Sequence, residues 1–209
     1  MSRFPLRPDA AGAEFLGLKE FPDWDAAFGS RGPLELEIGC GAGGFALEYA
    51  RRNPLVRYVA MEWRKKFARE VAHRAVVRGI TNLKVIEGDA KLEVPRLFRP
   101  GSLAVIHLQF PDPWWKTAHF KRAIVRKDFA AVLLTLLTPG GVFEMRTDVE
   151  ERAHQMLKIL EEVGFHNALG KGVFHPALPE EVPSTRERRY LQTGEPVYRA
   201  RLTRPVTSG

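Results

Sequence analysis

The sequence predicts an α/β fold: a doubly wound, mostly parallel sheet of seven strands in a single domain. From Leu34 onward, apolar runs of strand length alternate with longer runs of helical periodicity, which is typical of a sheet whose strands are connected by helices. The chain has 209 residues, of which 44% are hydrophobic. That is enough for one full α/β domain and too short for two ordinary ones. We therefore expect an N-terminal arm at residues 1–33 and one domain at residues 34–209.

The expected arm is rich in proline and aromatic residues. Its prolines are Pro5, Pro8, Pro22 and Pro33, and its aromatic residues include Phe15, Phe21, Trp24 and Phe28. Terminal segments are poorly ordered unless something holds them, so we expect a loose arm that packs onto the domain.

Strands and helices are expected to alternate through most of the domain. The expected strands are Leu34–Ile38, Val56–Glu62, Leu83–Glu87, Leu103–Phe110 and Val142–Thr147, and the expected helices are Phe45–Arg52, Lys66–Arg78, Ile124–Leu137 and Glu150–Val163. The run Leu103–Phe110 is nearly all apolar, as a strand buried on both faces should be. Two further strands are expected around Phe165–Phe174 and Val197–Thr203.

Each expected helix ends at residues that do not continue it. Pro54 follows the first helix, Gly79 the second and Gly164 the fourth, while the third stops at Thr138-Pro139-Gly140-Gly141. Proline lacks the amide hydrogen that a helix needs, and glycine readily takes the left-handed conformation of a helix end.

Charge and cysteine content limit the function. The formal net charge of +7 favours a polyanionic partner such as nucleic acid. Cys40 is the one cysteine, which excludes an internal disulfide framework and a multi-cysteine metal site, and we expect no metal. No apolar run approaches the roughly 18 residues of a membrane span, and Met1 to Gly12 hold no stretch typical of a signal peptide. We expect a cytoplasmic protein with no membrane partner.

A glycine loop follows the first strand. In a doubly wound sheet the ligand lies at the carboxyl ends of the strands, so this loop is the first place to look for a site. Gly39, Gly41 and Gly44 satisfy the GxGxxG pattern of dinucleotide-binding proteins. Glycines let the backbone approach a ligand closely. By itself the loop does not separate a dehydrogenase from a methyltransferase.

Three acidic residues favour the methyltransferase. Glu37 stands two residues before the first glycine, where a carboxylate would repel a pyrophosphate but suits a ligand with an ammonium and a sulfonium group. Glu62 follows the second strand and could accept ribose hydroxyls, and Asp89 follows the third and could accept from an adenine amino group. The trio resembles the class I methyltransferase pattern and implies S-adenosylmethionine. Structural roles as a salt-bridging acid or solvated strand ends are the alternatives, and Cys40 is expected to be a small loop residue.

The fourth strand runs into Phe110-Pro111-Asp112-Pro113-Trp114-Trp115-Lys116. The two prolines fix the backbone on either side of Asp112, so its carboxylate is aimed. The tryptophans offer faces on which a base could stack. A carboxylate suits a target that becomes cationic, and guanine N7 becomes cationic on methylation without losing a proton. Asp112 could instead cap the following turn.

Two basic or polar segments follow. Lys116, His119, Lys121, Arg122, Arg126 and Lys127 form a run that we interpret as an RNA phosphate track, the alternative being the solvated face of a helix. Asp148 follows the fifth strand. A loop before the last strand carries Ser184, Thr185, Arg186 and Glu187, which could bind a base edge or phosphates.

These segments together resemble the bacterial tRNA (guanine-N7-)-methyltransferase family. The shared pieces are Leu36-Glu37-Ile38-Gly39-Cys40-Gly41, Phe110-Pro111-Asp112-Pro113-Trp114 with its basic continuation, Thr147-Asp148, and a C-terminal segment with Glu187, Tyr190 and Gly194. The resemblance implies a Rossmann-like class I fold and methyl transfer from S-adenosylmethionine to guanine N7 at tRNA position 46.

The resemblance also implies roles for individual residues. It implies cofactor contacts at Glu37, Gly39, Gly41, Glu62, Asp89 and Asp112; catalysis at Asp112; target contacts at Lys116, Asp148, Ser184, Thr185, Arg186 and Glu187; and RNA contacts at His119, Lys121 and Arg122. Three other functions stay open: a methyltransferase with a non-RNA acceptor, a nicotinamide dehydrogenase, and a non-catalytic RNA-binding module. The sequence does not indicate the oligomeric state.

Overall fold

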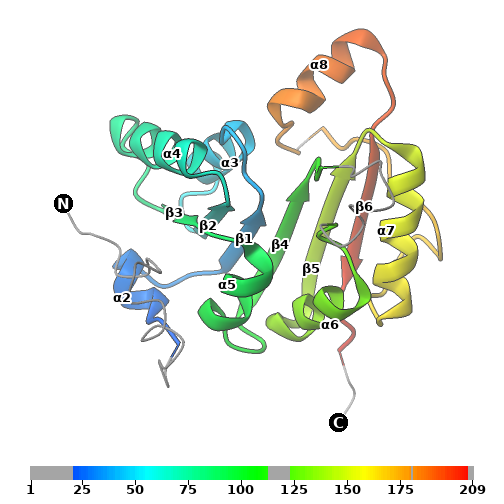
Figure 1. Ribbon diagram of the computed structural model, residues 1–209, viewed down its shortest axis with the longest axis horizontal. Helices are drawn as coiled ribbons and strands as arrows, with labels where there is room; N and C mark the ends of the chain where they lie inside the picture. The colour runs from blue at the N-terminus through cyan, green and yellow to red at the C-terminus, as the bar shows by residue number, and fades with distance from the viewer. Residues whose placement is uncertain (1–20, 113–122, 180, 207–209) are drawn as a thin grey trace. The chain divides into compact units, whose positions relative to one another are not determined.

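The computed structural model describes residues 21–112, 123–179 and 181–206. The chain forms two compact units, Met1–Arg99 and Pro100–Gly209. Each unit is built of strands with helices packed on them (Figure 1). None of the helices in the described ranges is long and apolar enough to span a bilayer.

The first unit contains three parallel strands in the order β3-β2-β1. The strands are β1 (Leu34–Ile38), β2 (Arg57–Glu62) and β3 (Leu83–Glu87), and the helices are α2 (Trp24–Phe28), α3 (Gly44–Arg52), α4 (Lys65–Val77) and α5 (Ala90–Leu97). All residues of β1 are buried, as are those of β2 after Arg57. Such continuous burial is what a parallel strand covered on both faces requires.

The described end of the expected arm packs onto this unit. Trp24 is buried, its ring stacks on Phe98 at 5.1 Å between centroids, and its indole nitrogen donates to the Leu97 carbonyl oxygen at 2.9 Å. An indole buries a large apolar area once its N–H has a partner, so this contact anchors α2.

The second unit contains β4 (Leu103–Gln109), β5 (Leu137–Thr147) and β6 (Tyr198–Thr203). β4 and β5 are parallel, whereas β5 and β6 are antiparallel and lie side by side in Figure 1. The helices are α6 (Lys127–Leu136), α7 (Glu150–Glu162) and α8 (Thr185–Thr193). β5 begins at Leu137, so Thr138-Pro139-Gly140-Gly141 continues from the end of α6 into a strand.

The expectation of seven strands is wrong for the described part of the chain, which forms six. The run Phe165–Phe174 forms no strand; isolated bridges to β6 occur at His166 and, just after the run, at His175. Between them the Asn167 side chain accepts from the Leu169 amide and donates to the Val173 carbonyl oxygen, which closes a compact loop. An asparagine that bonds nearby backbone offers the chain an alternative to the sheet ladder.

A polar row crosses the interior of the second unit. His107 on β4, Glu144 on β5 and Arg201 on β6 occupy paired positions; His107 Nδ1 lies 3.3 Å from Glu144 Oε2 and Arg201 Nη1 lies 3.6 Å from Oε1. Burial alone would raise the pKa of Glu144, but the His107 hydrogen bond and the charges of His107, Arg201 and Arg146 lower it to about 2.

The low pKa of Glu144 predicts acid sensitivity. A carboxyl whose pKa is depressed on folding stabilises the protein at pH values above its unfolded pKa, and this contribution disappears as the pH falls through the folded value. The free energy of unfolding should therefore decrease between about pH 5 and pH 2, with up to about 3 kcal/mol coming from Glu144. Urea unfolding of the wild type and of Glu144→Gln across this pH range tests the prediction. An equally steep decrease of the free energy of unfolding in the variant would contradict the contribution of Glu144.

Candidate active site

The glycine loop between β1 and α3 is open where a ligand would approach. Gly39 and Gly41 have φ values of 78° and 53°, in the left-handed region that glycine adopts at no steric cost. A Cβ atom added at Gly39 would meet nothing within 4 Å, and one added at Gly41 would meet only Arg64 Nη2, at 4.0 Å. Gly43 differs, because its Cβ would lie 2.5 Å from the Val71 side chain of α4. The first two glycines thus keep space clear, and Gly43 permits close packing.

Glu62 connects the end of β2 to this loop. Its side chain is buried; Oε2 accepts from the Gly41 amide at 2.8 Å, and Oε1 accepts from the Arg64 amide and Nε at 3.0 and 2.9 Å. The structure therefore brings Glu62 and Gly41 together, as the sequence predicted for a shared site. Each carboxylate oxygen can accept two hydrogen bonds, so Oε2 retains capacity beyond the Gly41 amide.

Glu37 is a second buried carboxylate, 1% exposed, at the carboxyl end of β1. The Tyr58 hydroxyl donates to its Oε2 at 3.1 Å. Burial and the neighbouring Glu37 carboxylate raise the pKa of Tyr58, which keeps the phenol protonated as a donor. This hydrogen bond fixes the position of the buried Glu37 side chain at the end of β1.

Asp89 and Cys40 have simpler surroundings. Asp89 is exposed and caps α5, where its Oδ1 accepts from the Lys91 amide at 3.0 Å. Burial, and then the charges of Glu37 and Glu62, raise the pKa of the Cys40 thiol. A neutral thiol is a poor nucleophile, in line with the expectation that Cys40 is a small loop residue.

Asp112 in the second unit follows a strained turn. Phe110, directly after β4, has a φ of 49°, and it is the one non-glycine residue with positive φ in the described ranges. Its amide donates to the Arg146 carbonyl oxygen at 2.8 Å, which holds the turn against β5. Strain of this kind costs about 1–3 kcal/mol and is concentrated at functional sites. Asp112 itself is exposed and, with Pro111, lines a cavity of about 250 Å³ that extends to α7.

Asp148 lies at the carboxyl end of β5 and contacts α8. The Tyr190 hydroxyl donates to its Oδ2 at 2.5 Å, and Arg186 Nη1 lies 3.7 Å from Oδ1. Hydrogen bonding to Asp148 raises the pKa of Tyr190, so the phenol remains a donor. Asp148 and Arg186, predicted separately as target contacts, are thus brought together.

The predicted loop at Ser184–Glu187 is instead the start of helix α8, and two of its residues are buried. Ser184 and Glu187 form a capping box, in which each side chain accepts from the other's backbone amide, at 3.1 and 3.3 Å. Glu187 also accepts from Arg146 Nη1 at 2.7 Å and from Arg199 Nε at 2.8 Å. Thr185 and Arg186 point outward from the same turn and are exposed. The buried pair orients the exposed pair.

Four predicted RNA and target residues, Lys116, His119, Lys121 and Arg122, lie outside the described ranges, as do Trp114 and Trp115. In the ranges that are described, no group of three or more His, Cys, Asp or Glu side chains is arranged to hold a metal ion.

The chain is similar to known methyltransferases over most of its length. A family model described as "Putative methyltransferase" matches residues 31–200. A tRNA (guanine-N(7)-)-methyltransferase from Myxococcus xanthus is 63% identical over 99% of this chain and 100% of its own length, and one from Anaeromyxobacter dehalogenans is 56% identical over 88% and 92%. The chain belongs to the tRNA (guanine-N(7)-)-methyltransferase family.

Solved structures agree on the fold of this family member. The 16S rRNA methyltransferase KamB has a TM-score of 0.62 at 19% identity, over 88% of this chain and 94% of its own. A 16S rRNA (adenine(1408)-N(1))-methyltransferase from Catenulisporales acidiphilia has a TM-score of 0.61 at 17% identity, over 89% and 92%. The predicted Rossmann-like class I methyltransferase fold is confirmed.

Several residues that shape the site of this methyltransferase were not singled out from the sequence. Arg146 and Arg199 hold Glu187, Tyr190 holds Asp148, and Gln109 at the end of β4 is 8% exposed. Neither Nε2 nor Oε1 of Gln109 has a hydrogen-bond partner among the residues that the structure describes. An arginine inside an otherwise apolar strand must have a buried partner, which is the signal that Arg146 offered.

The Tyr190–Asp148 hydrogen bond predicts a change in target binding. Tyr190→Phe removes the donor that fixes the Asp148 carboxylate, and a hydrogen bond to a charged group contributes about 1.5–3 kcal/mol. We expect the KM for tRNA to rise about tenfold, with little change in kcat or in S-adenosylmethionine affinity.

Tyr198→Phe is the matched control for that variant. It removes a hydroxyl on β6, outside the target segment, whose pKa is raised by burial and by the charge of Glu150, and it should leave the KM for tRNA at the wild-type value. Equal effects of the two substitutions would contradict a specific role for Tyr190.

Proposed function

We propose that this chain transfers the methyl group of S-adenosylmethionine to N7 of a guanine in tRNA. The observation that carries the proposal is the 63% identity to the Myxococcus xanthus tRNA (guanine-N(7)-)-methyltransferase across nearly the full length of both chains. The geometry of the two units supports it, because each carries one half of the chemistry: binding of a cationic cofactor in the first and orientation of a base in the second.

The cofactor half consists of Glu37, Gly39, Gly41, Glu62 and Asp89. Two buried carboxylates beside an open glycine loop fit a ligand that carries ammonium and sulfonium groups and ribose hydroxyls, and they oppose a pyrophosphate. In our proposal Glu62 accepts from the ribose through the capacity left on Oε2, Glu37 provides negative charge near the cationic part, and Asp89 accepts from the adenine amino group. S-adenosylmethionine supplies an electrophilic methyl group when bound.

The catalytic half centres on Asp112. The N7 lone pair of guanine forms the new bond to the methyl carbon while the bond from sulfur to that carbon breaks and its electron pair returns to sulfur as a neutral thioether. No proton has to leave the reacting nitrogen, so no strong base is required. The purine gains positive charge as the methyl group is transferred. A carboxylate positioned by the turn at Phe110 stabilises that charge and can accept from guanine N1–H and the amino group. Holding the base in line contributes further through proximity.

The second unit also carries the proposed target contacts, on β5 and α8 and after Asp112. In the proposal Asp148, Thr185, Arg186 and Lys116 contact the target nucleotide. Ser184 and Glu187, assigned from the sequence as target contacts too, are buried and act by fixing the first turn of α8. His119, Lys121 and Arg122 contact the RNA backbone.

We further propose that the target is the variable-loop guanine at position 46 of tRNA. We also propose that the protein acts in the cytoplasm. Incubating the protein with labelled S-adenosylmethionine and unmodified tRNA transcripts, followed by nucleoside analysis, tests both the N7 chemistry and the target position. We expect label in 7-methylguanosine, and a transcript with adenine at position 46 should not be labelled. Label in another nucleoside would refute N7 chemistry. Transfer only to a non-RNA acceptor would replace tRNA as the substrate.

A further inference from the structure

The segment formed by helix α4 and its two flanking residues, Arg64 and Arg78, has a large excess of positive charge. Between Arg64 and Arg78 the sequence has six arginines and lysines and one acid, Glu70, a surplus of five against +7 for the whole protein. Beyond Arg64, five basic or histidine side chains in this stretch are exposed and form what we call the α4 basic surface: Lys65, Lys66, Arg69, His73 and Arg78. The predicted RNA track at residues 116–127 is a different segment, so the function described above does not use this surface.

The charges of the α4 basic surface are weakly compensated. Lys66 Nζ lies 3.9 Å from Glu70, and Arg69 Nε lies 4.0 Å from Glu87; both distances are at the outer limit of an ion pair. Lys65 and Arg69 stand four residues apart on the helix, where like charges repel each other. Helix α7 differs, since its lysine and arginine are interspersed with Glu150, Glu151, Glu161 and Glu162. An ordinary solvated helix has the mixed pattern of α7.

The start of α4 also opposes helix stability. Arg64 occupies the N-cap position and makes no side-chain capping bond, the first turn contains no acid, and it contains Lys65 and Lys66. Cations are unfavourable at this end because the helix dipole is positive there. Helix starts usually have a capping side chain and acidic residues. A helix start that lacks both, without a benefit for folding, indicates a functional constraint.

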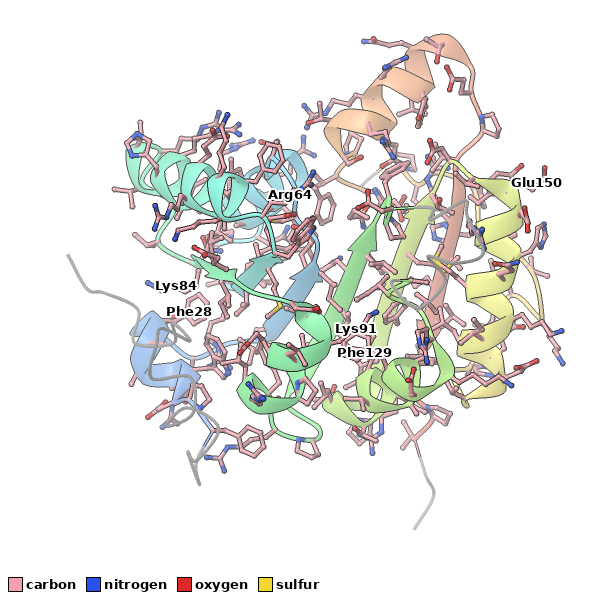
Figure 2. All side chains as sticks on the ribbon, viewed as in Figure 1. Phe28, Arg64, Lys84, Lys91, Phe129 and Glu150 are labelled. Atoms are coloured by element: carbon pink, nitrogen blue, oxygen red, sulfur yellow. The ribbon has the colours of Figure 1, made fainter. Side chains whose placement is uncertain are left out.

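Two arginines that do not belong to the α4 basic surface, Arg64 and Arg74, connect helix α4 to the glycine loop. Arg64 Nε donates to Glu62 at 2.9 Å, and Arg74 Nη1 donates to the Ala42 carbonyl oxygen at 2.7 Å. Figure 2 shows Arg64 at the start of α4 and nitrogen-tipped side chains projecting along the helix. These contacts fix the helix against the loop, so the exposed cations are presented on a rigid element.

We propose that the α4 basic surface binds the phosphate backbone of tRNA, as a second contact region separate from the track at residues 116–127; the inference rests on the proposed function. Lysine and arginine on one helix face, with only one acid among them, match the regular negative charge of a nucleic-acid backbone. A protein partner would be expected to bind through a face with a buried apolar or aromatic centre and few lysines. The same helix also exposes Val76 and Val77 near its end, so the choice of RNA rests on the six cations and one acid of this stretch.

The test is tRNA binding by the variant Lys66→Glu/Arg69→Glu. The matched control is Lys158→Glu/Lys171→Glu, which reverses two exposed lysines in the second unit and changes the net charge equally. Dissociation constants for an unmodified tRNA transcript are measured between low and physiological salt, with S-adenosylmethionine affinity and circular dichroism as checks of folding. We expect the α4 variant to bind tRNA at least about tenfold more weakly. The slope of the logarithm of tRNA affinity against the logarithm of salt concentration should also become shallower, by about 0.7–0.9 for each phosphate that the variant no longer neutralises.

The outcomes separate this inference from the proposed function. Unchanged tRNA affinity and salt slope in the α4 variant, or an equal loss of affinity in the control, overturns the inference even if the wild type forms 7-methylguanosine. If Lys66→Glu/Arg69→Glu does not fold, Lys65→Gln/Lys66→Gln is used in its place. This variant neutralises charge without reversing it and should still reduce the salt dependence of tRNA binding. Failure of the wild type to methylate any tRNA counts against the proposed function, which the methyl-transfer assay measures independently of binding.

Discussion

Replacing Asp112 with alanine is expected to lower kcat for tRNA methylation by about 10²–10³-fold while S-adenosylmethionine still binds. The carboxylate is proposed to stabilise the positive charge that appears on guanine as N7 is methylated, and this charge is greater in the transition state than in the bound substrate. Loss of an interaction of that type reduces kcat more than it raises KM. Glu37 and Glu62 remain in the variant, so cofactor binding should be retained.

Single-turnover methyl transfer to an unmodified tRNA transcript measures the effect, with calorimetry reporting cofactor affinity. Asp112→Asn separates charge from shape, and it should be nearly as slow as the alanine variant. Asp128→Asn is the control, since Asp128 is an exposed acid that pairs with Arg126 and has no proposed role in methyl transfer. Wild-type turnover by Asp112→Ala would refute its catalytic role.

Replacing Glu187 with alanine should destabilise the protein by about 3 kcal/mol, because it removes the acid that buried Arg146 and Arg199 share, while Arg146 keeps Glu181 at 3.4 Å. The same substitution removes the capping box of α8 and so loosens the turn that carries Thr185 and Arg186. Urea unfolding measures the loss of stability. Glu187→Gln keeps the size and one hydrogen-bonding oxygen, so its stability should lie between those of the wild type and the alanine variant.

Catalytic measurements distinguish anchoring from direct target contact. If Glu187 acts by fixing α8, the glutamine variant should raise the KM for tRNA and leave S-adenosylmethionine affinity unchanged. Glu195→Ala, at an exposed acid beyond the end of α8, should change stability by less than about 0.5 kcal/mol. Wild-type stability of Glu187→Ala would contradict the buried ion-pair network.

The sequence predicted best those features that depend on neighbouring residues. The strands at 34–38 and 83–87 have the expected bounds, and the strand at 57–62 begins one residue later than expected. Continuous apolar runs between glycine and proline residues mark such strands clearly. The glycine loop and the acid after β2 also lie together, because carboxyl ends of neighbouring parallel strands meet at one edge of the sheet.

Two features that depend on local side-chain hydrogen bonds were missed. The expected strand at 165–174 has apolar residues of the right kind, but Asn167 closes a local loop that its composition did not reveal. The segment at 184–193 was expected to be a loop because its hydroxyl and charged residues suggested ligand contacts. It forms α8 through the Ser184–Glu187 capping box, a pattern that can be recognised from sequence.

The role of Glu187 was missed for a different reason, because its partners are distant in the chain. Its partner Arg146 is 41 positions away in the chain, and Arg199 is 12 away. A glutamate in a polar segment gave no sign that two arginines from neighbouring strands would bury it. Residue type did not reveal which residues of the segment are buried and which are exposed, and the structure was needed to divide them.

The most direct test of the central proposal, methyl transfer to guanine N7, uses a tRNA transcript with 7-deazaguanine at the target position. This base keeps N1–H, the amino group and O6 but has a C–H in place of N7, so Asp112 can still hold it while no lone pair is present to react. We expect the modified transcript to bind as well as the ordinary one and to receive no methyl group there, while the ordinary transcript forms 7-methylguanosine. Equal methylation of the two transcripts would contradict the proposal.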